Sequence, residues 1–373
     1  MRKASPIVYI FYGYASLQDD AITKVASQLR DGLRADGIDA RLVGLRSLPR
    51  RLGGPLEKAR STVKEFLFLL QALGLILLRW PSLRAVVALE YPPGMPMVGR
   101  LAHLVSRGRI MDVTWVMDLY ALMPGGPSIT TGLRSFKSSL SRWALGASSR
   151  RVVLGSCMSR LLKEASGLDS RVIPLWHREL DVPVTSGQPD RLNLLYSGNA
   201  RDIHPLRALG QVVDGPVSRG RVHFRVTGSG KAIVELEELA RTMTASAIHV
   251  SSFVPEASLI DLYGASDVQV VSLAEGATGT CVPSKTYAAM SAGRPILYLG
   301  SPEGQAALDV IEAGCGIVVP TGSRRRIEEV LEGFLEDPAL VRRMGDAGRH
   351  FARERRSTTS LMPLWRDALG LTR

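Results

Sequence analysis

The chain has 373 residues, of which 45% are hydrophobic and 22% are charged. This length suits two domains, and this composition is ordinary for a globular protein with sizeable cores, which excludes a disordered tail and a fibrous protein. The formal net charge of +12 indicates an acidic partner, such as a nucleic acid or an anionic membrane surface.

The cysteines and the N-terminus indicate the compartment. Cys157, Cys281 and Cys315 lie far apart and form no CxxC pair, so they predict neither a disulfide framework nor a zinc site. The apolar run that begins at Ile7 is short and is interrupted by Gly13, which is unlike the core of a signal peptide. We therefore expect a protein of the reducing cytoplasm that is not exported.

The first half of the chain alternates apolar strands with helices. A strand at 7–12 is followed by a helix from about Asp19 to Asp36 and by a second strand at 40–45. Further elements are expected at 85–91, 97–106, 109–120 and 150–156, the second of them a helix. Strands that are apolar throughout and separated by helices predict a parallel sheet with both faces covered.

A basic segment surrounds an apolar stretch in this half. Between Arg41 and Arg84 there are nine lysines or arginines against two glutamates, Glu57 and Glu65. The apolar stretch at 66–78 is shorter than the roughly 20 residues that span a bilayer, but it suits a helix lying in an anionic membrane surface. The alternative is a buried helix with solvated flanks. Nucleic acid is not indicated, because aromatic residues make up only 6% and do not interleave with the basic ones.

The second half begins after a linker at about 178–191, which is rich in proline, glycine and polar residues. Its expected strands each end at a glycine or a polar turn; they are 192–197, 222–227, 248–254, 268–273 and 295–300. Ligands bind beyond the carboxyl ends of such strands. The expected domains are 1–180 and 192–350, followed by a helical end at 351–373 that packs back across the cleft between them.

The stretch 276–300 has the pattern of a phosphate site: a glycine loop, a helix of about two turns and a buried strand. Ser284 is expected to cap the helix, and Lys285 stands in its first turn. A lysine there opposes the helix dipole, at a cost of roughly 0.3–1 kcal/mol. A diphosphate between Lys285 and the backbone amides would explain it, and the alternative is a solvated surface lysine.

A second group of residues lies at the end of the first strand of this half. Gly198 and Asn199 form a turn there, and Arg201 would face the same diphosphate as Lys285. The turn that contains Gly228 is a weaker signal, because it lacks both the dinucleotide-binding spacing and the full Walker sequence. Hydride transfer and nucleotide hydrolysis are therefore not indicated, and the six histidines show no metal-ligand spacing.

Three further residues are candidates with equally plain structural alternatives. Asp118 follows a strand and would orient an acceptor hydroxyl or take its proton, or it is a turn aspartate. Gly13 would let an acceptor approach the backbone, or it is a turn glycine. Glu275 would touch the donor sugar, or it is a solvated loop glutamate.

Several segments of the second half occur in an order that is typical of one enzyme family. They are YSGNARDIHPL, VTGSG, VSSFVPEASLIDLYGASDVQVVSL, GTCVPSKTYAAMSAGRPIL, AGCGIVVPTG and EDPALVRRMGDAGR. These segments resemble the C-terminal domain of the large family of retaining GT-B glycosyltransferases, and they cover nearly the whole second half. WVMDLYALMP and SRRVVLGSCMSRLLKE resemble the N-terminal domain, especially of bacterial envelope-sugar members.

The resemblance implies an α/β protein of two Rossmann-like, doubly wound parallel-sheet domains facing a cleft. It implies sugar transfer from a nucleotide diphosphate, with UDP favoured, with retention at the anomeric carbon and with no metal or other cofactor. Arg201 and Lys285 would replace the metal, while Asp118 and Gly13 would face the acceptor. The residues implied at the donor are Gly198, Asn199, Gly228, Phe253, Val254, Glu275, Gly279, Thr280 and Ser284.

The sequence departs from the family pattern at one point. Many members carry two glutamates with seven residues between them, and the second binds the ribose of the nucleotide. Thr280 and Ala288 occupy those positions here, and a methyl group cannot accept a hydrogen bond from a hydroxyl. The Pro-Ser-Lys form of the motif occurs in one branch of the family, so the activity prediction stands, but the ribose must be bound by other groups.

Together these patterns predict a cytoplasmic enzyme at the inner face of the cell membrane. It would transfer a sugar from a nucleotide diphosphate to a lipid-linked or amphipathic acceptor in the synthesis of envelope polysaccharide or glycolipid. Two alternatives stay open: transfer to a soluble natural product, and a non-catalytic protein that binds nucleotide sugars.

Overall fold

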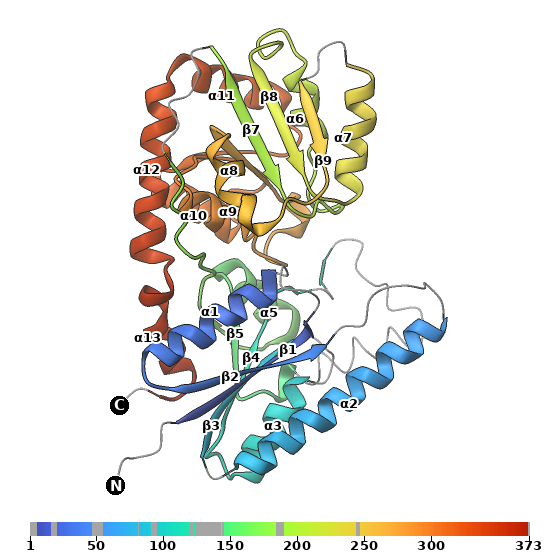
Figure 1. Cartoon of the computed structure of the whole chain (residues 1–373), viewed down its shortest axis with the longest axis vertical. Helices are drawn as coiled ribbons and strands as arrows, with labels where there is room; N and C mark the ends of the chain where they lie inside the picture. The colour runs from blue at the N-terminus through green and yellow to red at the C-terminus, as the bar shows by residue number, and fades with distance from the viewer. Residues whose placement is uncertain are drawn as a thin grey trace. The chain divides into compact units, whose positions relative to one another are not determined.

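The chain forms two compact units. The computed structural model describes residues 6–15, 21–46, 55–80, 82–90, 95–119, 122–123, 143, 145–183, 190–243 and 247–371. The first unit combines Met1–Pro174 with Thr358–Arg373, and the second is Leu175–Ser357. Each is an α/β unit with its own sheet (Figure 1).

The first unit contains a six-stranded sheet, in which all pairs are parallel and the order is β2-β1-β3-β4-β5-β6. Its strands are β1 (Ile7–Ala15), β2 (Asp39–Arg46), β3 (Leu83–Leu89), β4 (Met111–Trp115), β5 (Arg150–Val153) and β6 (Arg171–Val172). Its helices are α1 (Ala21–Ala35), α2 (Pro55–Arg79), α3 (Met95–Val105), α5 (Ser156–Ser166) and α13 (Thr358–Ala368). The parallel sheet predicted from the apolar strands is confirmed.

Helices cover this sheet on both sides. Phe68 and Ile76 of α2 and Met95 of α3 pack in one core with strands β1 and β3. On α1, Gly32 leaves room for α13, because a Cβ atom there would lie 2.7 Å from the Met362 sulfur. The apolar helix predicted at 66–78 is longer than expected: α2 begins at Pro55, since the polar residues before the apolar stretch are themselves good helix formers.

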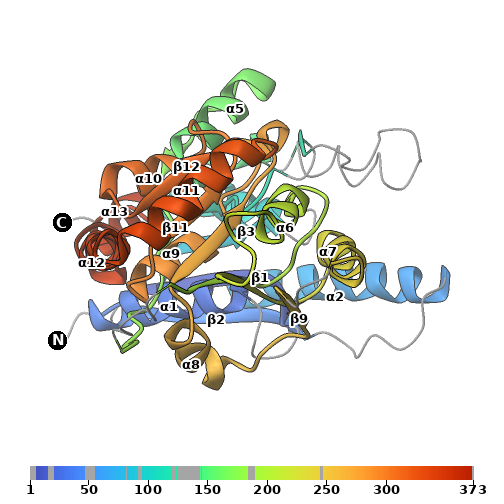
Figure 2. The same cartoon turned by 90° about the horizontal axis from the view of Figure 1, so that it is seen from above.

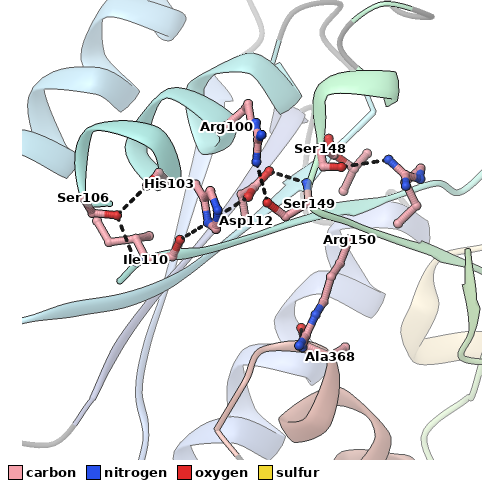
Figure 3. Close-up of polar contacts among 11 residues, drawn as sticks. Arg100, His103, Ser106, Ile110, Asp112, Ser148, Ser149, Arg150 and Ala368 are labelled. Atoms are coloured by element: carbon pink, nitrogen blue, oxygen red, sulfur yellow. Dashed lines mark hydrogen bonds and ion pairs between the residues drawn. The ribbon is translucent and has the colours of Figure 1, made fainter. Parts of the chain in front are cut away.

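Hydrogen bonds and ring packing hold the last helix in the first unit. Arg150 donates to the carbonyl oxygens of Asp367 at 2.6 Å and Ala368 at 2.7 Å, which satisfies carbonyls that the end of α13 leaves free (Figure 3). The Trp115 and Trp365 rings meet edge to face at 4.7 Å. Residues 358–371 are thus joined to a sheet that lies some two hundred residues earlier in the sequence.

A buried polar network fixes the amino end of β4 (Figure 3). The Asp112 carboxylate accepts a hydrogen bond from the Ser149 backbone at 2.8 Å and lies 3.4 Å from the His103 ring. His103 Nδ1 is 2.7 Å from the Ile110 carbonyl oxygen and therefore carries the proton that it donates there. These contacts join α3, β4 and the turn before β5.

The second unit repeats the architecture with the sheet order β12-β11-β10-β7-β8-β9, again parallel throughout. Its strands are β7 (Leu192–Ser197), β8 (Val222–Thr227), β9 (Ile248–Ser251), β10 (Val268–Ser272), β11 (Ile296–Leu299) and β12 (Gly316–Val319). Its α-helices are α6 (Arg207–Val213), α7 (Lys231–Arg241), α8 (Leu259–Gly264), α9 (Lys285–Ser291), α10 (Gln305–Ala313), α11 (Arg324–Glu336) and α12 (Pro338–Arg355). Helices α6 and α7 lie side by side (Figure 2) and share one core with α11.

Each sheet has one place where the strand order reverses. In the first unit the chain leaves β1 for β2 on one side and later adds β3 on the other. In the second it leaves β7 for β8 and later adds β10 on the opposite side. Crevices at such reversal points, beyond the carboxyl ends of the strands, are where open α/β sheets bind ligands.

Within the described ranges, none of the helices combines the length and apolar character needed to cross a bilayer.

Candidate functional site

The reversal point of the second sheet is framed by two glycine turns in close contact. Gly198 follows β7 and Gly228 follows β8, both with positive φ angles, +117° and +138°. A Cβ atom on Gly228 would lie 2.2 Å from the Gly198 carbonyl oxygen, so no other residue fits there without moving the backbone. The two turns therefore bring the backbones of adjacent strand ends into contact.

Lys285 reaches this point from the start of α9. Its Nζ donates a hydrogen bond to the Asn199 carbonyl at 3.2 Å and lies 4.8 Å from the centre of the Tyr196 ring. The Tyr196 hydroxyl donates to the same carbonyl at 3.0 Å. Burial, with a smaller effect of the positive charge of Arg201, lowers the pKa of Lys285 to about 8. Among the described residues, this ammonium group forms no ion pair with a carboxylate.

Arg201 adds a second positive charge to the site, and His204 contacts its backbone. Arg201 is exposed, and its backbone N–H donates to His204 Nδ1 at 3.2 Å. Burial, aided by the charges of Lys285 and Arg201, lowers the pKa of His204 to about 3. His204 is therefore neutral at pH 7, with its proton on Nε2 because Nδ1 accepts a hydrogen bond. We had not expected His204 to belong to the site.

The resulting arrangement suits an anion. In the described part of the chain, neither Arg201 nor Lys285 forms an ion pair with a carboxylate, whereas Lys231 nearby is paired with Asp202 at 3.1 Å. The positive charges of Arg201 and Lys285 repel each other, which destabilises the folded protein. An anion bound between them offsets this repulsion. A diphosphate carries the charge and the oxygen acceptors that such a site requires.

Phe253 and Val254 follow β9 at the same edge of the sheet. The Phe253 ring is 58% exposed, and Val254 is half-buried. An exposed ring at the ligand-binding edge is suited to stacking against a planar base.

Two predicted donor residues, Glu275 and Thr280, have other partners. Both carboxylate oxygens of Glu275 accept hydrogen bonds from Thr321, one from its backbone at 2.9 Å and one from its hydroxyl at 2.7 Å. Thr280 is buried, and its hydroxyl donates to the Ala277 carbonyl at 2.7 Å. Gly279 forms the turn between these segments, with a φ of +81°.

The prediction that Ser284 caps α9 is wrong. Its backbone is already helical, with φ −62° and ψ −22°, and its side chain makes no capping hydrogen bond. A capping serine needs an extended backbone to turn its hydroxyl toward the amides of the first turn. The prediction of a helix about two turns long is confirmed, since α9 has seven residues.

A buried ion pair holds α9 from behind. Arg356 binds Asp309 with two hydrogen bonds, at 2.6 and 3.0 Å, and the Tyr287 hydroxyl donates to the same carboxylate at 2.8 Å. Asp309 and Arg356 are 1% and 8% exposed. Tyr287 lies two residues beyond Lys285, so this network fixes the helix that carries the lysine. Nothing in the sequence pattern pointed to it, because the partners come from three separate helices and loops.

The first sheet carries carboxylates at the corresponding edge. Asp118 is half-buried beyond the end of β4, and Gly13 lies near the end of β1. Glu90, which directly follows β3, was missed by the sequence analysis. Its signal was visible: a carboxylate ends a strand whose preceding five residues are all apolar and buried.

The sequence matches no known family model and no curated protein sequence. Solved structures nevertheless share the fold over almost the whole chain. A sucrose-phosphate synthase from Thermosynechococcus elongatus is 15% identical, with a TM-score of 0.73 over 98% of this chain and 100% of that chain. WaaG, a glycosyltransferase involved in lipopolysaccharide biosynthesis, is 16% identical, with a TM-score of 0.68 over 97% and 99%. Anabaena HepE in complex with UDP-glucose is 12% identical, with a TM-score of 0.66 over 98% and 100%. The chain therefore has the two-sheet α/β fold of GT-B glycosyltransferases, as the sequence predicted.

Proposed function

We propose that this protein is a glycosyltransferase that uses a nucleotide diphosphate sugar, with UDP as the favoured nucleotide. One observation carries the proposal: Arg201 and Lys285 meet beside two touching glycine turns without a carboxylate partner in the described chain. The likeness to HepE solved with UDP-glucose supports the choice of UDP.

In this proposal the two cations bind the diphosphate and stabilise the charge that grows on it as the sugar leaves. Preorganised positive charge at a developing anion often lowers an activation barrier more than any other single effect. The same two charges take the place of a metal ion, so we propose that none is required. The base stacks on Phe253 against Val254, and the backbone of Gly279 and Thr280 approaches the phosphates. Asp118 and Gly13 lie on the acceptor side, and attack on the face that the nucleotide leaves gives retention.

Ribose recognition requires a different solution from that of the family. Thr280 donates to the Ala277 carbonyl, and Ala288 has no polar side chain, so neither supplies a carboxylate. Glu275 is the nearest acidic residue on the loop after β10, but Thr321 occupies both of its oxygens. We propose that Glu275 orders that loop instead of binding the donor sugar itself.

The direct test is thermal stability of the purified protein with UDP, GDP, ADP and TDP in turn. A nucleotide at 100 times its Kd stabilises the folded state by about 2.7 kcal/mol. We expect stabilisation by UDP that is lost in Lys285→Ala and in Arg201→Ala. Lys163→Ala and Arg325→Ala are matched controls, because both side chains are exposed and lie outside the site.

Turnover then separates an enzyme from a binding protein. UDP release from a UDP sugar, abolished in both site variants while they remain folded, supports transfer. Stabilisation by UDP without product would favour the non-catalytic alternative, and wild-type rates in both site variants would refute the assigned roles.

We further propose that the acceptor is lipid-linked and that the protein binds the cytoplasmic membrane surface through α2. Six apolar side chains of α2 are between 49% and 78% exposed; they are Val63, Phe66, Leu67, Leu70, Leu77 and Leu78. At 3.6 residues per turn these positions fall within an arc of roughly 120°. The opposite face of the helix is buried in the core through Phe68, Ala72 and Ile76. An apolar face of this width on a packed helix suits the boundary between lipid headgroups and chains.

The neighbouring helix extends this surface. Helix α3 packs against α2 and exposes Leu101, Leu104 and Val105. Four exposed arginines stand near the ends of the two helices: Arg79, Arg84, Arg107 and Arg109. Basic residues at the rim of an apolar surface favour anionic lipid.

Vesicle flotation tests this part of the proposal. The protein should float with phosphatidylcholine vesicles that contain phosphatidylglycerol and much less with phosphatidylcholine alone. Leu77→Ser combined with Leu78→Ser should abolish binding, whereas Val234→Ser, at an exposed apolar residue of the second unit, should not. No binding to the anionic vesicles would favour a soluble acceptor.

A further inference from the structure

A groove of about 310 Å³ lies on one face of the second sheet, at the amino ends of β7, β8 and β9. In the parallel register of these strands, Asn193 lies beside His223 and Arg225 lies beside His249. Side chains of such neighbours, and of residues two apart on one strand, emerge on the same face of a sheet. These four side chains therefore share the face opposite to Phe224, which packs in the core with α6, α7 and α11.

The groove is separate from the proposed diphosphate site. His223 is the second residue of β8, whereas Gly228 follows the last residue of that strand. The five residues from one to the other extend roughly 16 Å along the strand. The other wall of the groove is formed by Leu262 of α8 and by Ala265 and Ser266 after it. A ligand here would bind at the end of the sheet away from Lys285.

The charged side chains that line this groove are basic. Within the described part of the chain, the lining contains two arginines, two histidines and no acidic residue; the four are Arg191, Arg225, His223 and His249. The neighbouring acid, Asp267, accepts hydrogen bonds from the backbone and the side chain of Asn193, at 2.8 and 2.9 Å. Two guanidinium groups disfavour a metal cation and favour an anion.

The His223 ring has a polar atom that a ligand could satisfy. Its Nε2 is buried and makes no hydrogen bond with the described residues. Buried polar atoms of this kind are rare in folded proteins and call for an explanation, such as a bound molecule. Burial, with a smaller effect of the Arg191 charge, lowers the pKa of His223 from its ordinary 6.5. The ring is therefore mostly neutral at pH 7, and with its proton on Nε2 it would donate to a ligand oxygen.

We propose that this groove binds a phosphate ester, with the phosphate group held by Arg225 and His223 and the organic part against Leu262 and Ala265. The planar guanidinium group of arginine matches two phosphate oxygens at once. A volume of about 310 Å³ exceeds the needs of a phosphate ion alone and lies at the lower end of the range for small-molecule pockets, about 300–1,000 Å³. The site goes beyond the proposed sugar transfer and does not depend on it.

The test follows the His223 ring by NMR in protein labelled with nitrogen-15 at histidine. The His223 signals are those missing in His223→Gln, and they also report which nitrogen carries the proton. At pH 7.5 and constant ionic strength, glycerol 2-phosphate should shift these signals in a saturable way, while glycerol and acetate should not. Arg225→Gln should weaken the binding at least about tenfold. Arg241→Gln, at an exposed arginine of the same unit, should leave it unchanged.

Other results would overturn the inference. No saturable shift, an equal shift with acetate, or full affinity in Arg225→Gln would each contradict it, and tighter binding of inorganic phosphate would refute the choice of an ester. Loss of the shift in Lys285→Ala would place the phosphate at the diphosphate site instead. Stabilisation by UDP should be unchanged in Arg225→Gln, so failure of the proposed function and failure of this inference appear in different measurements.

Discussion

The two units share one topology but present opposite charges at their reversal points. Beyond the strand ends of the second sheet lie Arg201 and Lys285, beside His204, which burial keeps neutral. The first ends in Glu90 and Asp118. Strand order determines where each crevice lies, while side chains following the strands determine what it binds. The diphosphate that we propose suits the positive charge of the second edge, whereas the first edge carries carboxyl groups.

The two edges also differ in how they are supported. Lys285 stands on the short helix α9, which contacts the buried Asp309–Arg356 pair through Tyr287. Removing one partner of such a pair costs about 3–5 kcal/mol, because the other charge stays buried. We expect Asp309→Ala to lower the free energy of unfolding by that amount in urea denaturation. Glu332→Ala, at an exposed acid of the same unit, should change it by less than about 0.5 kcal/mol.

A loss below about 1 kcal/mol in Asp309→Ala would show that α9 does not depend on this pair. The position of Lys285 would then depend on the local turns alone, and the proposed difference in support between the two edges would be wrong.

The edge of the first sheet should also make the stability of the protein depend on pH, through Glu90. The pKa of Glu90 is raised from 4.5 to about 8 in the folded state. Its contribution to stability is therefore fully present below about pH 4.5 and is lost as the pH rises through about 8. Between pH 5 and 8 the wild type should lose about 2–4 kcal/mol relative to Glu90→Gln. Unfolding curves of the two proteins at each pH measure this difference; a constant difference across the range would mean that Glu90 is ionised.

The sequence could predict what depends on local pattern. Apolar runs predict the strands of the sheets, and glycines after strands predict the turns at Gly198 and Gly228. Both glycines have a positive φ, and a Cβ atom on Gly228 would lie 2.2 Å from the Gly198 carbonyl oxygen. The two-turn helix that carries Lys285 is predicted from the glycine loop before it and the buried strand after it. These features are determined by neighbours in sequence.

What the sequence could not predict depends on distant contacts. The pKa of Glu90 depends on burial and on Asp118, which follows β4, whereas Glu90 follows β3. The network of Tyr287, Asp309 and Arg356 joins residues that are 22 and 47 positions apart. The sequence predicts Ser284 as a helix cap, but its backbone is already helical and its side chain makes no capping hydrogen bond.

The cationic edge should recognise the base as well as the phosphates. Base stacking on an aromatic ring is worth about 1–3 kcal/mol. We expect Phe253→Ala to weaken UDP binding by about 5- to 150-fold in calorimetry while leaving binding of inorganic diphosphate unchanged. Val234→Ala removes an apolar side chain of similar exposure from α7 and should have no effect. Equal losses for UDP and diphosphate would place Phe253 away from the base.

The smallest expected effect is the loss of UDP affinity at alkaline pH. Lys285 has its pKa lowered to about 8, so raising the pH removes its charge, just as it gives Glu90 one. If UDP binds the charged lysine, its affinity should be level below pH 8 and fall above it, by up to about tenfold, or 1.4 kcal/mol, per pH unit. Lys285→Arg keeps its charge throughout this range, because the pKa of arginine lies above 12. Its UDP affinity should therefore stay level up to pH 9 in calorimetric titrations at matched ionic strength. A fall of the same size in Lys285→Arg would assign the titration to another group, and the charge at the second edge would then rest on Arg201 alone.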